Sequence, residues 1–362
     1  MTELQAIIRN FQIVGTANNI TPFGEGMINS TYRVTLKDID RQYVLQKINH
    51  NIFKDVDMLQ NNIKRITDHI RHKLNEAGET DVDRKTLTLI SSVDDKLYYF
   101  DGENYWRMML LIPKSKTYEA ITPEYAYYAG KAFGNFQSML ADLPGEPLGE
   151  TIPDFHNMEF RLKQFHEAVA CNAVGRLSVV SDLIGEIEKR ADEMCQCERL
   201  YREGKLPKRI NHCDTKVNNM LFDANGNVLC VIDLDTAMPG FVMSDFGDFM
   251  RTAGNPGKED DLDLNNVTFN MEIFKSYTKG YLESAKNFLS SIEIELLPFG
   301  ARLLTYMQLT RFLADYLNGD TYYKINNPLH NLQRSKAQFK LLQSIEANYA
   351  EMQDFIKTTV VF

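Results

Sequence analysis

The N-terminal part of the chain carries a pattern of apolar and polar residues that is typical of strands. Between residues 11 and 48, short runs rich in β-branched and aromatic residues are separated by glycines or by an Asp-rich turn. Such runs with short connections favour neighbouring antiparallel strands. We therefore predict a sheet in this region. Its clearest strands are residues 31–36 and 43–48, and further strand signals follow at 86–91, 96–100 and 105–112.

A helical pattern interrupts these strands between residues 55 and 78. Apolar residues recur there at three- and four-residue spacing, which places them on one face of a helix. Asp55 is a suitable N-cap and Gly78 a suitable end. We expect the apolar face to pack against the sheet. Its members are Val56, Leu59, Ile63, Ile66, Ile70 and Leu74.

The pattern changes after Pro113, from strands to long helices. Thr122-Pro123-Glu124 places a cap residue, a proline and an acid in the order that favours a helix start. A chain of 362 residues also exceeds one compact core. We therefore predict an α+β protein of two lobes, a small β-rich N-terminal lobe (residues 1–112) and a larger, mostly α-helical C-terminal lobe (residues 113–362). Further helical stretches are predicted roughly at 158–170, 178–203, 268–290, 294–318 and 332–357.

One window of the helical lobe, residues 210–236, is not helical and is rich in Asp and Asn. Its Asn225-Gly226 pair is a strong signal for a two-residue turn between two short strands. With that turn as the centre of a hairpin, Leu221 would face Cys230 on the opposite strand.

The same register would bring Asn219 close to Asp233. The two residues become diagonal neighbours across the hairpin, and such neighbours lie about 7 to 8 Å apart. Two oxygen ligands at this separation can bind one cation, and carboxylate and amide oxygens suit Mg²⁺. We predict a metal site formed by Asn219 and Asp233.

Just before this hairpin, His212, Asp214 and Asn219 reproduce the H-x-D-x-x-x-x-N spacing of a kinase catalytic loop. Phosphoryl transfer depends on positioning and on neutralising charge more than on covalent chemistry. Asp214 is therefore the candidate base for an acceptor hydroxyl, and Lys216 is a candidate contact for the transferred phosphate.

Other interpretations of this window stay open. His212, Cys213 and Cys230 could hold zinc, although structural zinc commonly uses four ligands in paired spacings that are absent here. Cys213 could act as a nucleophile with a distant His. The spacing could also be incidental in a polar loop.

A glycine loop lies between the first predicted strands. Gly24 and Gly26 would let backbone N–H groups approach phosphates without obstruction by Cβ atoms. Lys47 lies near the end of the predicted strand at 43–48, the second strand after the glycine loop. Kinase folds present a phosphate-binding lysine in this order. The predicted helix offers no Glu between Asp55 and Arg71, so the partner of Lys47 is open.

A second motif, Asp245-Phe246-Gly247, imitates the metal-binding Asp-Phe-Gly of protein kinases. It lies well beyond Asn219, whereas Asp233 lies on the strand paired with that residue. We expect Asp245 and Asp248 to cap a helix or to pair with Arg251 instead.

Composition narrows the possible partners. A formal charge of −9 argues against nucleic acid, which requires clustered Lys and Arg. The sequence contains no apolar run of the length of a signal peptide or of a membrane span, so we expect a cytoplasmic protein without a membrane partner. Five cysteines, an odd number without a Cys-x-x-Cys pair, fit reduced thiols.

These motifs together resemble the aminoglycoside phosphotransferase and choline kinase superfamily, and within it the N-acetylhexosamine 1-kinases. The resemblance extends over most of the chain. It implies a bilobal protein-kinase-like fold, with ATP and Mg²⁺ as cofactors and a small sugar as the partner. The sugar would be N-acetylglucosamine or N-acetylgalactosamine, phosphorylated on its anomeric hydroxyl. The residues that carry it are Ile28-Asn29-Ser30-Thr31-Tyr32, Val44–Asn49, Trp106-Arg107, Thr151–His156, His212–Lys216, Ile232–Thr236, Arg311–Leu317 and Gly319-Asp320.

The resemblance also implies roles for individual residues. Asp214 would be the base, Asn219 and Asp233 the metal ligands, and Asp214, Thr236, Arg311 and Tyr322 the sugar contacts. The nucleotide would be bound by Gly24, Gly26, Asn29, Thr31 and Lys47, together with Lys216 as a phosphate contact.

Two alternatives to this function remain. A kinase of the same fold could act on another hydroxyl compound such as choline, homoserine, methylthioribose or an aminoglycoside. Cationic acceptors would favour an acidic pocket, which Arg311 argues against. The chain could also be a catalytically inactive kinase fold that serves as a binding module.

Overall fold

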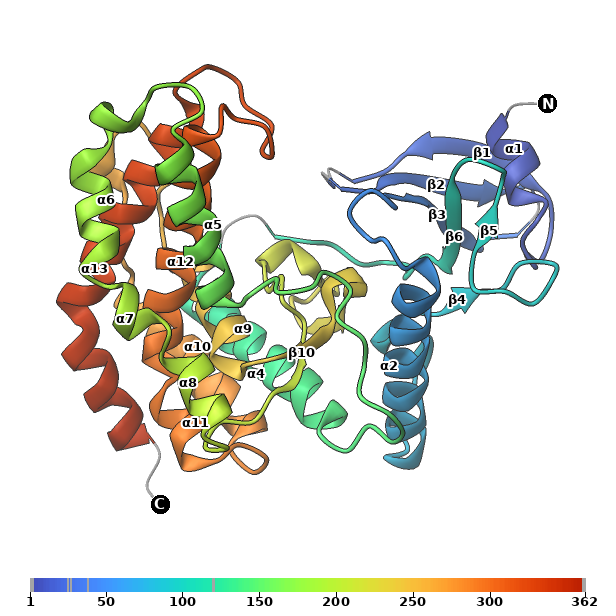
Figure 1. Cartoon of the computed structure of the whole chain (residues 1–362). Coiled ribbons are helices and arrows are strands. Elements are labelled where there is room, and N and C mark those ends of the chain that lie inside the picture. Colours follow the sequence, from blue (N-terminus) through green and yellow to red (C-terminus); the bar gives the residue numbers. More distant parts are fainter. Residues whose placement is uncertain (1–2, 25, 27, 38, 119–120, 360–362) are drawn as a thin grey trace. The chain divides into compact units, whose positions relative to one another are not determined.

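The computed structural model describes residues 3–24, 26, 28–37, 39–118 and 121–359, so Glu25 and Met27 of the predicted glycine loop lie outside the described residues. Its elements form two compact units (Figure 1). The first, here the sheet unit, comprises Met1–Thr117, Asp142–Pro153 and Met220–Met238. The second, the helical unit, comprises Tyr118–Ala141, Asp154–Asn219 and Pro239–Phe362. This grouping differs from a single boundary between residues 112 and 113, because two later segments pack with the sheet.

The sheet unit confirms the predicted antiparallel sheet. The strand order is β1-β2-β3-β6-β4, and β5 pairs with β6. The two clearest predicted strands are present as β2 and β3, whereas the signals at 86–91 and 96–100 shorten to two residues each. The strands are β1 (Ala17–Pro22), β2 (Ser30–Leu36), β3 (Gln42–Ile48), β4 (Leu89–Ile90), β5 (Tyr99–Phe100) and β6 (Tyr105–Leu110).

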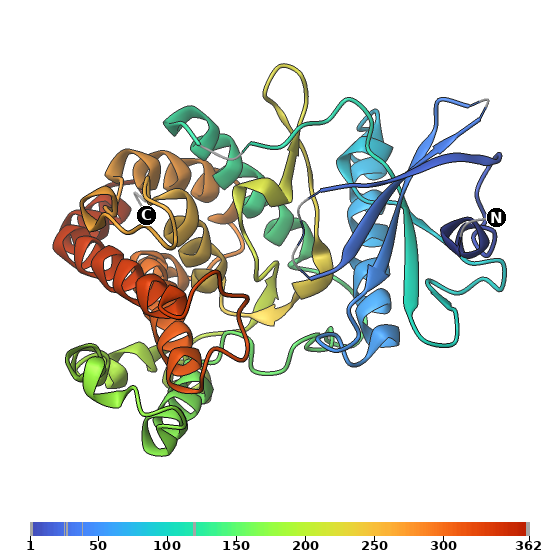
Figure 2. The ribbon, with the colours of Figure 1, turned by 90° about the horizontal axis from the view of Figure 1, so that it is seen from above.

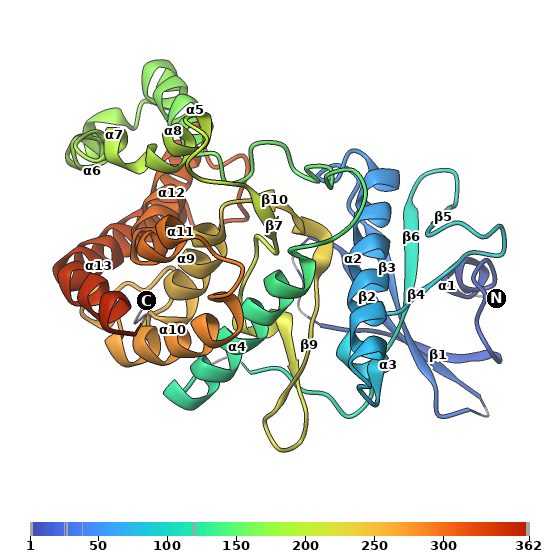
Figure 3. The same ribbon diagram turned by 90° about the horizontal axis from the view of Figure 1, so that it is seen from below.

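Helices cover both faces of this sheet (Figures 2 and 3). Helix α1 (Glu3–Ile8) lies on one face, where Ile7 and Ile8 join a buried apolar cluster with side chains from β2, β3 and β6. Helix α2 (Val56–Glu76) lies on the other side. The strand residues of the cluster are Val34, Leu36, Tyr43, Leu45, Trp106 and Met108.

The long helix α2 begins and ends as its sequence predicts. Asp55 is the N-cap, and its Oδ1 accepts a hydrogen bond of 2.9 Å from the backbone N–H of Met58. Gly78, just beyond the end, has a φ of 70°, which a side chain would disfavour. The short α3 (Val82–Lys85) follows. Buried Asn62 of α2 exchanges hydrogen bonds with the backbone of Gly149, which helps to explain why Asp142–Pro153 belongs to the sheet unit.

The predicted hairpin is present, but its turn is wider than expected. Strands β8 (Met220–Phe222) and β9 (Val228–Val231) are antiparallel, and Leu221 faces Cys230 as predicted. The two-residue turn is wrong, since Phe222 pairs with Val228 across an irregularity in the register. Asp223 accounts for this, because its carboxylate accepts hydrogen bonds from the backbone N–H groups of Asn225 and Asn227. The irregularity compensates for the wider turn, so the register near Asn219 is the predicted one.

The helical unit contains most of the predicted helices. Thr122 caps the first of them, as expected. The predicted helical stretch at 178–203 is helical, but it is divided into three shorter helices, because packing redirects the chain at points that periodicity does not show. Its longer helices are α4 (Pro123–Leu140), α5 (Met158–Cys171), α9 (Val242–Ala253), α10 (Met271–Ala285), α12 (Leu297–Leu317) and α13 (His330–Thr359). The shorter helices are α6 (Ser181–Glu188), α7 (Ala191–Met194), α8 (Gln196–Arg202) and α11 (Ser291–Glu295), and the short strands are β7 (Arg209–Asn211) and β10 (Met238–Gly240), of which β10 crosses the boundary between the units.

Helix α9 packs closely against α12 because both carry a glycine at the crossing. A Cβ atom on Gly247 would overlap the backbone oxygen of Gly300, and one on Gly300 would overlap that of Met243. Such overlap allows only glycine here. The packing matters for the site, since α9 holds the loop described next.

Candidate active site

The predicted catalytic loop brings Asp214, Lys216 and Asn219 into direct contact. Lys216 Nζ lies 2.8 Å from Asp214 Oδ1. The side-chain amide of Asn219 donates hydrogen bonds to the backbone oxygen of Asp214 (2.8 Å) and to its Oδ2 (3.0 Å). A short 3-10 turn, Val217–Asn219, sets this geometry. The arrangement leaves a carboxylate with one positive neighbour and one amide neighbour.

Charge at the loop keeps Lys216 protonated. Burial alone lowers the pKa of Lys216, but the carboxylates of Asp214 and Asp248 outweigh it, and the pKa is raised above its ordinary value. A protonated Lys216 beside Asp214 can stabilise negative charge, so this residue suits contact with a phosphoryl group.

The amide of Asn219 is oriented by these bonds. Its nitrogen donates to Asp214, and within the described residues its oxygen accepts no hydrogen bond. An amide oxygen is a ligand that Mg²⁺ accepts. The chemistry of this donor therefore fits the metal role that the sequence predicts.

Asp245 and Asp248 of α9 hold the loop from below. Asp245 accepts hydrogen bonds from the backbone N–H groups of His212 (2.7 Å) and Cys213 (2.8 Å). Asp248 accepts one from the N–H of Thr215 (3.1 Å). The predicted pair of Asp248 with Arg251 is confirmed at 3.0 Å. Capping or pairing is wrong for Asp245, because its buried carboxylate binds the loop backbone instead.

Burial raises the pKa of Asp245 to about 6, although its hydrogen bonds and the nearby His212 act in the opposite direction. The sequence pattern missed this residue as part of the site. The signal was present in the Asp-Phe-Gly motif, but it belongs to a supporting carboxylate.

In the sheet unit, Asp233 lies two residues beyond the end of β9. It has a φ of 61°, in the left-handed region that few non-glycine residues adopt. The turn that follows it, Leu234–Thr236, is a short 3-10 helix with buried Asp235 and Thr236. Asn219 belongs to the helical unit, so the two predicted metal ligands come from different units. Thr236 is likewise separated by unit from Arg311 and Tyr322, its predicted partners in the sugar site.

The glycine loop connects β1 to β2. Gly24 has a φ of 74° and open space where a Cβ would lie. Gly26 has no such conformation, and a Cβ there would be 3.9 Å from the backbone oxygen of Asn29. The predicted use of Gly24 for close backbone approach is therefore compatible with the local geometry.

Asn29 and Thr31 use their side chains inside the sheet unit. Asn29 donates to Asp235 Oδ2 (2.6 Å), and its Oδ1 accepts from the N–H of Asn49 (2.9 Å). Thr31 Oγ1 accepts a hydrogen bond of 3.0 Å from Gln46. Their predicted nucleotide contacts stay a prediction, and the structure adds a role in fixing the loop.

Lys47 and Gln46 point to opposite faces of the sheet. Lys47 pairs with Trp106 and Gln46 pairs with Arg107, and neighbouring residues of a strand alternate between faces. Trp106 belongs to the apolar cluster under α1, so Lys47 shares that face. Lys47 makes no ion pair with any described residue. Phosphate contact by Lys47 stays a prediction, with Gln46 as the neighbour on the other face.

Arg107 and Asp235 form a buried ion pair on the Gln46 face. Both guanidinium NH₂ groups of Arg107 donate to the two carboxylate oxygens, one of them at 2.9 Å. The side chains are only 3% and 4% exposed. Arg107 also donates to Gln46 Oε1 (2.8 Å). This pair connects the sheet to the turn after Asp233.

The predicted sugar residues Arg311 and Tyr322 lie among aromatic rings in the helical unit. The Arg311 guanidinium is 5.4 Å from the ring centre of Phe155 and 5.9 Å from that of Tyr322. Asp315 orders the neighbouring loop, because its carboxylate accepts hydrogen bonds from the N–H groups of Tyr322 (2.8 Å) and Tyr323 (3.0 Å). Tyr322 remains 64% exposed, so its ring is available to a ligand.

Arg161 is a second arginine, besides Arg311, that lies next to Phe155. Arg161 donates twice to the backbone oxygen of Phe155, at 2.8 and 3.1 Å. Burial, together with the positive charge of the nearby Arg311, lowers the pKa of Arg161 to about 10. Neither arginine forms an ion pair with a carboxylate in the described part of the chain.

His156 stacks on Phe155 with ring centres 4.6 Å apart. Its Nδ1 is buried and has no hydrogen-bond partner among the described residues. Burial lowers the pKa of His156 to about 4, and the positive charges of Arg311 and Arg161 act in the same direction. The sequence pattern alone assigned no role to Arg161 or His156.

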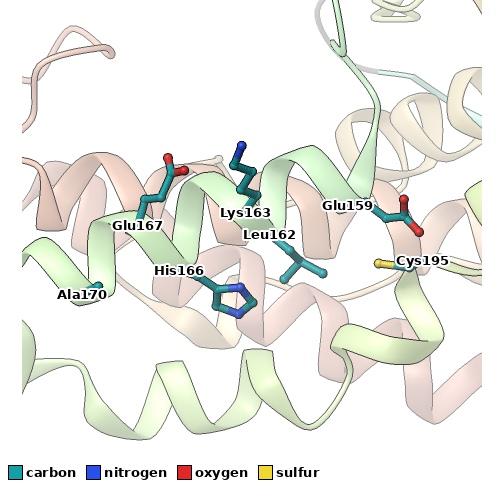
Figure 4. Close-up of a pocket in the computed structure, with 7 residues that line it drawn as sticks. All are labelled: Glu159, Leu162, Lys163, His166, Glu167, Ala170 and Cys195. Carbon is teal, nitrogen blue, oxygen red and sulfur yellow. The ribbon is translucent and has the colours of Figure 1, made fainter.

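A surface depression of about 520 Å³ lies elsewhere in the helical unit, along α5 (Figure 4). None of the predicted site residues lines it. Within the described ranges, no group of three or more His, Cys, Asp or Glu side chains is placed to hold a metal ion. No helix in the described part of the chain combines the length and the apolar character that crossing a membrane requires. The depression is lined by Glu159, Leu162, Lys163, His166, Glu167, Ala170 and Cys195.

The chain is similar to a known protein family and to several solved structures. Residues 19–266, more than half of the chain, match the phosphotransferase enzyme family. An aminoglycoside phosphotransferase from Alicyclobacillus acidocaldarius is similar in structure, at 12% identity, with 98% of this chain and 96% of that chain covered and a TM-score of 0.64. A choline kinase from Cryptosporidium parvum is also similar, at 13% identity, with 98% of each chain covered and a TM-score of 0.59. A spectinomycin phosphotransferase in complex with ADP and spectinomycin is similar at 12% identity. The match covers 96% of this chain and 98% of that chain, with a TM-score of 0.57. At these identities the likeness shows a shared fold.

Proposed function

The chain belongs to the phosphotransferase enzyme family, and from this premise we propose that it is an ATP-dependent kinase that phosphorylates the anomeric hydroxyl of an N-acetylhexosamine. The observation that carries the proposal is the contact of Asp214 with both Lys216 and Asn219. These three residues provide a base, a cation and a metal ligand in one loop, which are the parts that phosphoryl transfer requires.

In this proposal Asp214 accepts the proton of the acceptor hydroxyl and orients the oxygen for attack on the γ-phosphoryl group. Protonated Lys216 lies beside the transferred group. Asn219 and Asp233 would hold Mg²⁺, which when bound neutralises charge on the phosphates. A structural relative that binds ADP supports nucleotide use.

The charge around Arg311 supports a neutral sugar as the acceptor. Arg311 and Arg161 are close enough for one to lower the pKa of the other, and neither is paired with a carboxylate among the described residues. A cationic acceptor such as choline or an aminoglycoside would be repelled there. The rings of Phe155 and Tyr322 add the apolar and aromatic surface that sugar sites combine with hydrogen-bonding groups.

Incubation of the protein with Mg²⁺-ATP and a panel of acceptors tests the proposal. The panel contains N-acetylglucosamine, N-acetylgalactosamine, glucose, choline, homoserine, methylthioribose and an aminoglycoside, and ³¹P and ¹H NMR locate the new phosphate. We expect a 1-phosphate of an N-acetylhexosamine. Phosphate on another carbon, or preference for another acceptor, would refute the proposed N-acetylhexosamine 1-kinase activity. The more general proposal that the protein is a kinase would then still hold. Absence of ATP consumption with every acceptor would instead favour a binding module.

A further inference from the structure

A closed network of hydrogen bonds in the sheet unit joins the glycine loop to the turn that carries Asp233. Asn29, at the end of the glycine loop, donates to Asp235. Asp235 also binds Arg107, and Arg107 donates to Gln46, which in turn donates to Thr31. All of these residues lie in the sheet unit. The network therefore begins and ends on strand β2 and its preceding loop.

The oxygens of Asp235 are already occupied by donors. Oδ2 accepts from Arg107 (2.9 Å) and from Asn29 (2.6 Å), and Oδ1 accepts from the other NH₂ group of Arg107. A cation at this carboxylate would displace a buried guanidinium, which is costly because both charges are withdrawn from water. Asp235 is therefore suited to hold structure and not to bind metal directly.

We propose that Asp235 is a positioning residue that couples the binding of nucleotide to the binding of the divalent ion. The proposal rests on the ATP and Mg²⁺ use proposed above. Asp235 lies two residues after Asp233 and shares its turn, so the Arg107 pair fixes the place of that turn on the sheet. Asn29 links the same carboxylate to the loop expected to cover the phosphates. A nucleotide bound by that loop then also favours the position of the metal-bearing turn, and the metal does the reverse.

Isothermal titration calorimetry with ADP tests this coupling without relying on turnover. ADP is titrated into the full chain with MgCl₂ and again with EDTA, and the ratio of the two affinities gives the coupling factor. For wild type we expect a factor of about 5 to 150, the usual range for coupled sites. Asp235→Asn and Arg107→Gln should each reduce the factor by about five-fold or more, since the first change removes the carboxylate that Asn29 and Arg107 share and the second removes the ion pair that fixes the turn on the sheet.

The double variant Arg107→Gln/Asp235→Asn should be no worse than either single variant, because residues that act through one contact are not additive. Arg107→Lys and Asp235→Glu keep the charges and should restore part of the factor. Arg302→Gln is the matched control. It removes an arginine that binds both oxygens of Glu193 in the helical unit, at 2.6 and 2.7 Å, and should lower the melting temperature without changing the factor.

Three outcomes overturn the inference. ADP affinity could fall equally with and without Mg²⁺, the effects of the two single variants could add in the double variant, or the conservative variants could lose the coupling as fully as the neutral ones. If Asp235→Asn does not fold by circular dichroism, Arg107→Lys and Asp235→Glu still decide. Failure of wild type to bind ADP at all would refute the proposed function instead, which separates the two failures.

Discussion

The Oδ2 atom of Asp245 accepts a hydrogen bond of 2.7 Å from the backbone N–H of His212, a residue that precedes it in the chain by 33 positions. With the bond from Cys213 to Oδ1, both oxygens of Asp245 hold the start of the predicted catalytic loop. Cys213 itself has a φ of 62°, an unfavourable conformation for a residue with a side chain. The buried carboxylate thus stabilises a strained backbone immediately before Asp214.

Replacement of Asp245 by Asn should reduce turnover, because one of the two acceptor oxygens becomes an NH₂ group that faces a backbone N–H. We expect kcat to fall by about 10- to 100-fold, the order of one or two buried hydrogen bonds, and KM for ATP to change little. Steady-state kinetics measure both values. Asp192→Asn, at a carboxylate that is 99% exposed, is the control and should be neutral. An unchanged kcat in Asp245→Asn would remove its role in positioning the loop.

Replacement of Asp214 by Asn should leave the fold intact and reduce turnover by about 10²- to 10⁴-fold, the range for loss of a general base. The amide keeps the shape of the side chain but cannot accept the acceptor proton. Kinetics and thermal unfolding give the two parts of the test. Full activity with an unchanged melting temperature would mean that another group acts as the base.

Replacement of Arg311 by Gln should raise KM for the acceptor by about ten-fold or more, as expected for loss of a charged hydrogen bond to a ligand. KM for ATP should stay nearly constant, since the residue lies with the predicted sugar contacts. Arg334 offers a matched control, because the Arg334 guanidinium lies 6.0 Å from the ring centre of Tyr323 and the Arg311 guanidinium lies 5.7 Å from the same ring centre. An equal effect of Arg334→Gln would indicate a structural role for the whole aromatic cluster.

Gln46 and Lys47 can be separated by their effects on ATP. Because Gln46 faces the same side as Arg107 and Lys47 faces the apolar cluster under α1, we expect Gln46→Ala to raise KM for ATP by about 3- to 10-fold and Lys47→Ala to have a smaller effect. Kinetics at saturating acceptor measure both. The reverse order would favour the predicted phosphate contact by Lys47.

His156 should remain neutral well below the pH at which other histidines are protonated. Burial holds its pKa near 4 in the folded protein, below the ordinary value of 6.5. The unfolded chain therefore binds the proton first as the pH falls, so the stability contributed by neutral His156 is complete above pH 6.5 and is lost as the pH falls towards 4.

Histidine NMR across this pH range tests the value, with His156→Gln to assign the signal. The same substitution should flatten the fall in the free energy of unfolding between pH 6.5 and 4. A signal that titrates near 6.5 would contradict the burial that the structure shows.

Local patterns in the sequence account for much of the fold. The apolar face of α2 and its Asp55 cap depend on residues in or next to the helix. The local sequence therefore predicts where α2 begins and ends. The division of the helical stretch at 178–203 into shorter helices has a different origin. Arg190 at this break binds Glu346 of α13 at 2.8 Å, a partner that lies far along the chain and outside any local window.

By itself, the sequence determined the register that places Leu221 opposite Cys230, because short spacings and turns act between near neighbours. From the same kind of short spacing it predicts a catalytic loop around Asp214. Tertiary structure alone decided which carboxylates support that loop and that turn. Asp245 meets His212, and Asp235 meets Arg107, only after distant segments have packed. A buried charge requires a partner, but these partners lie far apart in the sequence. Local patterns of residues therefore do not show which residues will pair.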